Sequence, residues 1–286
     1  MDNRIDIWIS EAEEVWLEMV HKHTKELFSG TFLPSHDHTH HCRVWNICKN
    51  LLRSIASFNP YMDQALVEGV LIAAYFHDLG MIRSTREDHG MLGREICETY
   101  FEESAMELPS KLDEILDAIE YHDIKGREIS TGFQPAVSPG ILDILTVADD
   151  LEAMGVIGIY RYTEIYLKRK IDLKELGVRI LGNASARYKS IVESCMNCPA
   201  LISEYRPQYE LLISFFDSYN QQLLVHPPTR NVFYGHLGVV NFIRTLSVEG
   251  KTEPEVFLEK IDTNKAGSIV KEYFTALKSK LVKEHL

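Results

Sequence analysis

The stretch AAYFHDLGMIRSTREDHG, residues 73–90, decides how the chain is read, because an apolar run ends in an adjacent imidazole and carboxylate, His77 and Asp78. The run VLIAAYF that precedes this doublet is apolar on every side, which is typical of a fully buried helix. A third polar side chain, His89, follows twelve residues after His77. Because a buried carboxylate without a partner is costly, the doublet requires either a structural partner or a bound cation.

The rest of the chain is predicted to be all-α. Apolar residues recur every three or four positions through most of the 286 residues, and two-residue alternation is scarce. We predict Ser110 and Ser138 as the starts of two helices, and Gly80 as the end of the helix that carries the doublet. The other predicted helices cover 3–28, 155–169, 172–197 and 201–224, with three short helices after them.

The clearest break lies in VHPPTRN, residues 225–231, because two prolines stop a helix. This break divides the chain into a helical core, residues 1–225, and a C-terminal helical appendage, residues 226–286. Exposed amphipathic helices predicted at both ends of the chain are compatible with a homodimer.

The composition, 45% hydrophobic and 25% charged, is that of an ordinary globular protein. The net charge of −12 disfavours a nucleic-acid polymer as partner, but a bound metal can supply positive charge for a phosphorylated small molecule. We expect no signal peptide and no membrane span, because no run of about 18 apolar residues is evident. Five cysteines, an odd and sparse number, indicate reduced thiols and a cytoplasmic location; Cys195 and Cys198 are read as small core residues.

Position on a helix face separates six polar side chains from the others. His40 lies on an apolar stripe, and so does Asp149, whereas the neighbouring Asp150 falls on a polar side. The inward-facing set is His40, His77, Asp78, His89, His122 and Asp149. One core histidine is usually just hydrogen-bonded, but four histidines and two aspartates together are best explained by a cation.

The donor types of this set indicate the kind of cation. Imidazole nitrogen and carboxylate oxygen suit a divalent transition metal, namely Mn, Fe, Co, Ni or Zn, whereas Ca and Mg prefer oxygen alone. The sequence leaves open whether one ion or two is bound. Six ligands suit two ions, with Asp78 as the bridge because a carboxylate has two oxygens.

The order His40, His77-Asp78 and Asp149 resembles the HD-domain superfamily of metal-dependent phosphohydrolases, over about residues 30–165. Three segments carry the resemblance to the opening, doublet and closing motifs: HDHTHHCRVWNI (36–47), AAYFHDLG (73–80) and VADDLEAMGVIGIYRY (147–162). The last is similar to bacterial HD hydrolases that act on nucleotides. The resemblance implies an HD-domain helical bundle with additional C-terminal helices.

His89 in EDHGMLG and His122 in AIEYHDIKGR are similar to the two extra histidines of dinuclear members. Those members include hydrolases of dinucleoside polyphosphates and of cyclic dinucleotides. They also include an oxygenase branch with a di-iron centre, such as inositol oxygenase. In mononuclear relatives the same two positions touch the substrate phosphate or supply a proton.

The expected function is hydrolysis of a phosphate ester or anhydride of a small molecule, with a nucleotide as the expected substrate, by metal-activated water. Asp78 is the central catalytic residue, and His89 or His122, if not a ligand, protonates the leaving oxygen. Four cations are predicted to bind the substrate phosphate: Arg83, Arg86, Lys125 and Arg127. Two alternatives stay open, an HD-type di-iron oxygenase and a non-catalytic nucleotide-sensing module.

Overall fold

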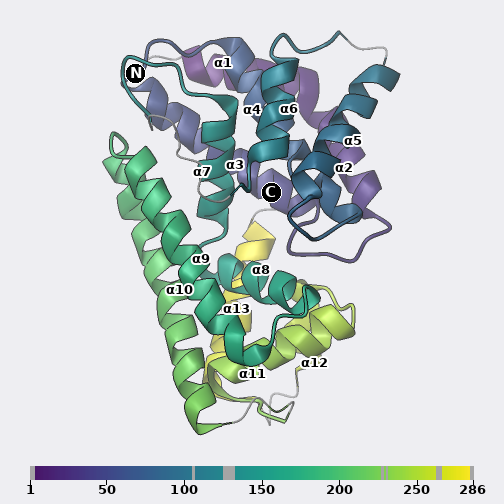
Figure 1. Cartoon of the computed structure of the whole chain (residues 1–286), viewed down its shortest axis with the longest axis vertical. Helices are drawn as coiled ribbons and strands as arrows, with labels where there is room; N and C mark the ends of the chain where they lie inside the picture. The colour runs from purple at the N-terminus through teal and green to yellow at the C-terminus, as the bar shows by residue number, and fades with distance from the viewer. Residues whose placement is uncertain are drawn as a thin grey trace. The chain divides into compact units, whose positions relative to one another are not determined.

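The computed structural model describes residues 4–104, 107–124, 133–226, 229, 231–261 and 266–283. Within those residues the protein is all-α and contains no strand (Figure 1), which confirms the predicted fold class. The chain forms two compact units. Unit 1 comprises Met1–Glu152 and Ser190–Ser203, and unit 2 comprises Ala153–Lys189 and Glu204–Leu286.

The predicted boundary between residues 1–225 and 226–286 does not coincide with this division. Helix α10 (Pro199–Val225) sends Phe216 into the same apolar cluster as Leu237 and Phe274, which follow the two prolines. A proline pair ends a helix but does not decide which apolar faces then pack together.

Unit 1 is built around the apolar helix α4 (Gln64–Phe76), which packs against all the other major helices of this unit. The N-cap of this helix is Asp63, whose side chain accepts a hydrogen bond from the backbone N–H of Leu66 at 2.7 Å. Its surroundings are α1 (Arg4–Ala12), the π-helical segment η1 (Glu13–Leu17), α2 (Glu18–Phe28), α3 (His38–Ala56), the 3-10 turn η2 (Leu79–Ile82), α5 (His89–Glu103), α6 (Leu112–Tyr121) and α7 (Ile141–Glu152).

By length and composition alone, helix α4 together with η2 could cross a membrane. This stretch, Gln64–Ile82, is the one such candidate among the described residues, and 83% of it is buried inside the structure. The sequence predicted no apolar stretch of this length. The apolar run continues past the His77-Asp78 doublet into the 3-10 turn, which makes the stretch longer.

Close backbone contacts at glycines bring α5 onto the end of α4. A Cβ added at Gly80, in η2, would lie 1.9 Å from the carbonyl oxygen of His89, and one at Gly93 would lie 3.1 Å from that of His77. Gly80 was predicted to end α4, but the helix already ends at Phe76. Its missing side chain instead allows η2 and α5 to touch.

Two further helix starts differ from the prediction. Helix α6 begins at Leu112 after Lys111, with no capping bond from a side chain, so Ser110 is not its cap. Helix α7 begins at Ile141 rather than directly after Ser138, and the N–H of Gly140 donates to the Asp143 carboxylate at 3.3 Å. In both helices a serine suited to capping stands too far upstream to cap.

Unit 2 has an apolar core of its own, in which aromatic side chains such as Tyr160, Phe216, Tyr219, Phe257 and Phe274 are buried together. Its helical elements are α8 (Gly155–Lys168), α9 (Leu173–Ser194) and α10 apart from their residues in unit 1, α11 (Gly235–Phe242), the π-helical segment η3 (Ile243–Glu249), the 3-10 turn η4 (Pro254–Val256), α12 (Phe257–Lys260) and α13 (Ser268–Lys283).

Candidate metal centre

Five helices of unit 1 bring the six inward-facing side chains to one place. His40 lies in the first turn of α3, and the doublet His77-Asp78 follows the last residue of α4. His89 is the first residue of α5, His122 is the C-cap of α6, and Asp149 lies in the last turn of α7. All six are buried, with at most 6% of any residue exposed.

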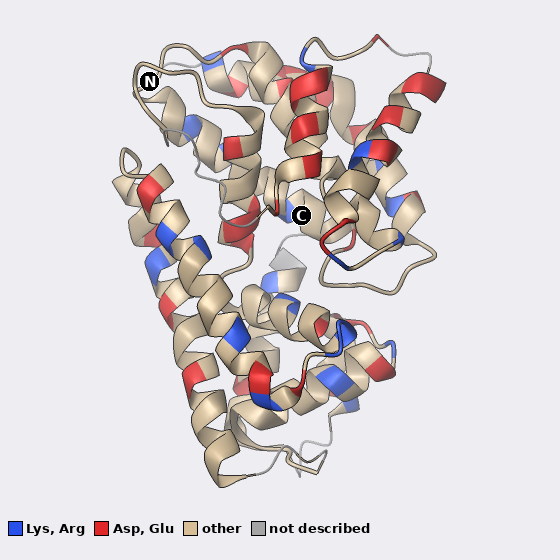
Figure 2. Ribbon diagram, viewed as in Figure 1, with Lys and Arg blue, Asp and Glu red and all other residues tan. Residues whose placement is uncertain are grey.

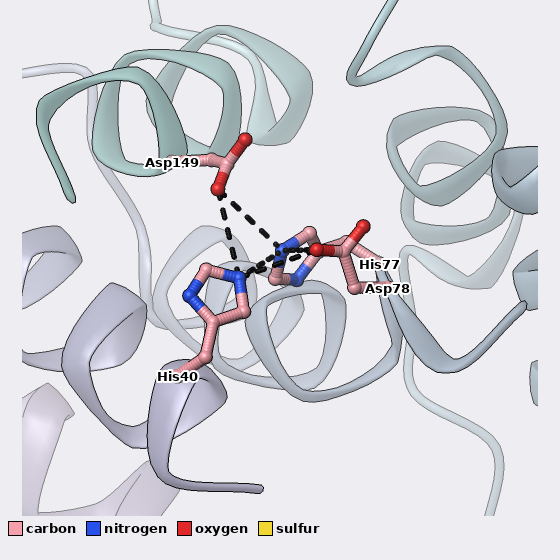
Figure 3. Close-up of side chains that lie close together, drawn as sticks. All are labelled: His40, His77, Asp78 and Asp149. Carbon is pink, nitrogen blue, oxygen red and sulfur yellow. Dashed lines mark hydrogen bonds and ion pairs between the residues drawn. The ribbon is translucent and has the colours of Figure 1, made fainter. Parts of the chain in front are cut away.

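Four of these side chains form one group of potential ligands: His40, His77, Asp78 and Asp149 (Figure 3). The Nε2 atom of His40 lies 3.1 Å from Nε2 of His77 and 3.3 Å from Oδ2 of Asp78. Asp149 directs Oδ1 to the same point, 3.6 Å from Nε2 of His40 and 3.9 Å from that of His77. One ligand atom of each residue lies within 4.8 Å of every other, which is a spacing suited to a single ion.

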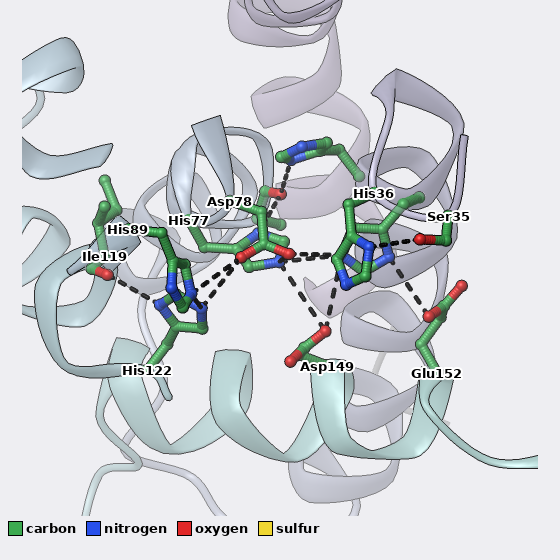
Figure 4. A network of polar contacts seen from close by, with 12 residues as sticks. Ser35, His36, His77, Asp78, His89, Ile119, His122, Asp149 and Glu152 are labelled. Atoms are coloured by element: carbon green, nitrogen blue, oxygen red, sulfur yellow. Dashed lines mark hydrogen bonds and ion pairs between the residues drawn. The ribbon is translucent and has the colours of Figure 1, made fainter. Parts of the chain in front are cut away.

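Asp78 also belongs to a second group, with His89 and His122 (Figure 4). Its Oδ1 atom lies 3.4 Å from Nε2 of His89 and 3.3 Å from Nε2 of His122, while its Oδ2 atom faces His40 and His77. Each oxygen of one carboxylate thus faces its own pair of imidazoles.

Backbone carbonyls fix the orientation of three of the four imidazoles. The Nδ1–H groups of His77, His89 and His122 donate to the carbonyl oxygens three residues earlier, at 3.0, 2.6 and 2.8 Å respectively. A carbonyl oxygen only accepts, so Nδ1 carries the proton in each neutral ring and Nε2 presents a lone pair. This is the arrangement that protein ligands of metals commonly adopt.

The donor set attracts a positive charge, either a metal ion or a proton. With Nδ1 protonated, the Nε2 lone pairs of neutral His89 and His122 face one another at 3.4 Å. Two lone pairs at this distance repel each other, and a shared positive charge removes the repulsion. His77 and His122 also stand at the C-terminal ends of α4 and α6, where the helix dipole favours positive charge.

Electrostatics in the cluster keep its central carboxylate ionised. Burial alone would raise the pKa of Asp78, but electrostatic interaction with His77 and the close contacts with His122, His40 and His77 hold this pKa well below its usual value. Burial alone would lower the pKa of His89, but the Asp78 carboxylate outweighs this effect and raises the pKa of His89 to about 9. The carboxylate therefore attracts positive charge strongly, whether as a proton or as a metal ion.

The four cations predicted to bind substrate phosphate are not gathered at the cluster. Arg83 is about half exposed and pairs with Glu95 at 3.3 Å, beside a cavity of about 400 Å³ that none of the six side chains lines. Arg86 is exposed, and its carbonyl accepts the bond from His89. Lys125 and Arg127 lie outside the described residues. Their binding of phosphate stays a prediction.

Sequence reasoning missed two charged residues beside the cluster, Arg43 and Glu152, both buried. The Oε2 atom of Glu152 lies 3.3 Å from Nδ1 of His40. The Oε1 atom of Glu152 accepts a hydrogen bond from Nε of Arg43 at 2.5 Å. Their spacing was a usable signal, because each stands three residues after a predicted ligand and so shares its helix face. The assignment of Asp150 to a polar side was wrong: Asp150 is buried, because α7 packs against α3, α4 and α6.

The acidic character expected from the composition is visible on α6, which carries four acidic residues and neither Lys nor Arg (Figure 2). Arg94 of α5 neutralises part of this surface by pairing with Asp117 at 2.8 Å and with Glu120 at 3.0 Å.

A protein-family model matches the part of the chain that holds this cluster. Residues 38–154 match the model of the HD domain family, and this range contains all six of the converging side chains. No curated protein and no solved structure matches the chain with significant similarity. Residues 38–154 therefore form an HD domain, a member of a superfamily that consists mostly of metal-dependent hydrolases.

Proposed function

We propose that the protein hydrolyses a phosphate ester or anhydride of a small molecule, most readily a nucleotide, at a centre of two divalent transition metal ions. His40, His77, Asp78 and Asp149 would hold one ion, and Asp78, His89 and His122 the other. Bound divalent ions lower the pKa of a coordinated water toward neutrality and draw negative charge from phosphoryl oxygens.

The observation that carries this proposal is the position of Asp78. Its two oxygens face different pairs of imidazole Nε2 atoms, at 3.3 to 3.4 Å in all four contacts. A structural site usually needs only about four ligands. Six side chains grouped about one bridging carboxylate, inside an HD domain, therefore support a reactive centre rather than a structural one.

The chain itself contributes orientation and charge. The three Nδ1–H bonds to backbone carbonyls hold His77, His89 and His122 with Nε2 directed inward. Because both His89 and His122 would hold the second ion, neither is the favoured proton donor for the leaving group. Arg83, which lies downstream of the doublet, would exchange Glu95 for a substrate phosphate.

The test is phosphate release from a panel of nucleotides, dinucleotides and phosphomonoesters, with the protein loaded with Mn²⁺, Co²⁺, Ni²⁺ or Fe²⁺. We expect turnover of at least one substrate. Asp78→Asn should lower that turnover at least about 100-fold, since loss of an outer partner of a ligand already costs 10- to 100-fold. Asp117→Asn, an exposed carboxylate on α6, serves as the control and should keep activity.

Other outcomes select the alternative functions. Iron in the purified protein together with substrate-dependent oxygen uptake would favour a di-iron oxygenase. Tight nucleotide binding with no turnover under any of these metals would favour a sensing module. Helical circular dichroism of Asp78→Asn must match that of the unsubstituted protein, because only then does loss of turnover report on the site.

A further inference from the structure

We propose that Glu152, held by Arg43, is a positioning residue for His40 and makes the four-ligand group the tighter of the two groups for a divalent transition metal. This inference rests on the metal centre of the proposed function. It concerns two buried charged residues that lie outside both groups of potential ligands.

The first observation is the way His40 is supported. Three histidines of the cluster donate Nδ1–H to neutral backbone carbonyls, whereas Nδ1 of His40 faces the carboxylate of Glu152 at 3.3 Å. The contact has the distance of an ion pair but not the geometry of a hydrogen bond, so the carboxylate acts on the ring through its charge. A negative charge beside one ring nitrogen makes the other nitrogen a stronger donor to a metal.

The second observation is that Glu152 is itself held in place. Arg43 donates from Nε to Oε1 of Glu152 at 2.5 Å and from Nη1 to Oγ1 of Thr39 at 3.0 Å. Thr39 in turn donates to Oδ1 of Asp37, the N-cap residue of α3, at 2.6 Å. The guanidinium is therefore fixed at both ends, and it leaves Oε2 of Glu152 directed at His40.

The third observation is burial. The side chains of His40, Arg43 and Glu152 are 0%, 5% and 2% exposed. Water therefore neither screens the ion pair nor competes for Nδ1 of His40, and the pair acts at low dielectric, where charge interactions are strong. A buried pair is a poor source of stability by comparison with apolar residues, which favours a role in orienting its neighbour.

The geometry predicts different affinities for the two groups. The four-ligand group contains two carboxylates and the one imidazole that a charged residue supports. The three-ligand group shares Asp78 and has only backbone-supported imidazoles. One equivalent of Mn²⁺ should therefore bind to the four-ligand group before the other group fills.

The test measures Mn²⁺ affinity by electron paramagnetic resonance in the full-length His122→Ala variant, in which the four-ligand group stays complete. Adding Glu152→Gln should weaken Mn²⁺ binding about 10- to 100-fold. Glu152→Asp keeps the charge but has a shorter side chain. Its Mn²⁺ affinity in the His122→Ala background should lie between that of His122→Ala alone and that of the variant with Glu152→Gln. Asp150→Asn neutralises an equally buried carboxylate of the same helix and should leave Mn²⁺ affinity nearly unchanged.

A double-mutant cycle separates positioning from a general effect of charge. If Glu152 acts through His40, Glu152→Gln should have little further effect on Mn²⁺ affinity in a His40→Ala protein. Equal losses in both backgrounds, or an equal loss from Asp150→Asn, would overturn the inference.

A measurement on the unsubstituted protein avoids the folding of variants. In the Zn²⁺-loaded protein with ¹⁵N-labelled histidine, Nδ1 of His40, which faces the Glu152 carboxylate, should carry the ring proton, and Nε2 should bind the metal. A His40 ring that binds Zn²⁺ through Nδ1 overturns the inference and leaves the proposed function standing. Failure of the unsubstituted protein to bind Mn²⁺ or Zn²⁺ at all overturns both.

Discussion

At the scale of single residues, the division of the cluster into two groups has a direct consequence for metal content. His89 belongs only to the three-ligand group, so His89→Ala leaves His40, His77 and Asp149 in place. We expect the unsubstituted protein to bind two equivalents of Mn²⁺ and His89→Ala to retain one. Equilibrium dialysis with elemental analysis measures this directly.

The matched control for that variant is His236→Ala, because His236 packs on Phe215 in unit 2 and lies outside both ligand groups. It should keep both equivalents. Loss of both ions from His89→Ala would show that the six side chains form one indivisible site.

The ligand candidates were predictable at this scale, and helix spacing also indicated that Arg43 and Glu152 share the ligand faces, but it did not indicate that these two residues pair with one another. His40 and Asp149 could be chosen from helix periodicity, since an inward polar residue interrupts an apolar stripe. The role of Glu152 depends on α3 and α7 lying side by side, which helix periodicity does not reveal. The carbonyl partners of the imidazoles cannot be predicted from the sequence either, because every residue type carries the same backbone carbonyl.

At the scale of elements, the contact between η2 and α5 makes Gly80 a sensitive position. A Cβ there would lie 1.9 Å from the carbonyl oxygen of His89 and 2.8 Å from the N–H nitrogen of Gly93, so α5 must shift. Gly80→Ala should lower the free energy of unfolding by about 1–3 kcal/mol. It should also weaken Mn²⁺ binding at the three-ligand group, although every ligand is present.

Gly182→Ala is the control for that substitution. Gly182 lies in α9, and a Cβ added there meets nothing within 4 Å. Alanine should therefore stabilise the helix by about 0.5–1 kcal/mol. Thermal unfolding of both variants gives the comparison, and an unchanged melting temperature for Gly80→Ala would contradict the close contact.

Elements were predicted better than their ends. The long helices follow from apolar periodicity, yet the starts of α6 and α7 were placed at Ser110 and Ser138, too early in both cases. Capping depends on whether a hydroxyl can reach the first free N–H groups, and this is set by the path of the preceding loop.

At the scale of the whole molecule, the core of unit 2 predicts the result of removing residues 226–286. The aromatic side chains that α10 contributes, such as Phe216 and Tyr219, share one cluster with Leu237, Phe257 and Phe274. Without those partners, residues 1–225 should expose apolar surface, bind a hydrophobic dye and aggregate. A monomeric fragment with one sharp unfolding transition would instead support a boundary at residue 225.

The thiols report on unfolding of the whole chain. All five cysteines are free, four are buried, and burial raises the pKa of Cys195 to about 12 and that of Cys198 to about 11. At pH 8 both stay protonated and unreactive, because thiolate forms only as the pH approaches the raised pKa. A thiol reagent should therefore label these two residues slowly in the native protein and rapidly in denaturant.

The chain passes between its two units three times, after Glu152, Lys189 and Ser203. Neither unit is therefore a contiguous piece of the gene, and no single cut separates them. Cutting the chain at any one position therefore leaves at least one of the two units incomplete.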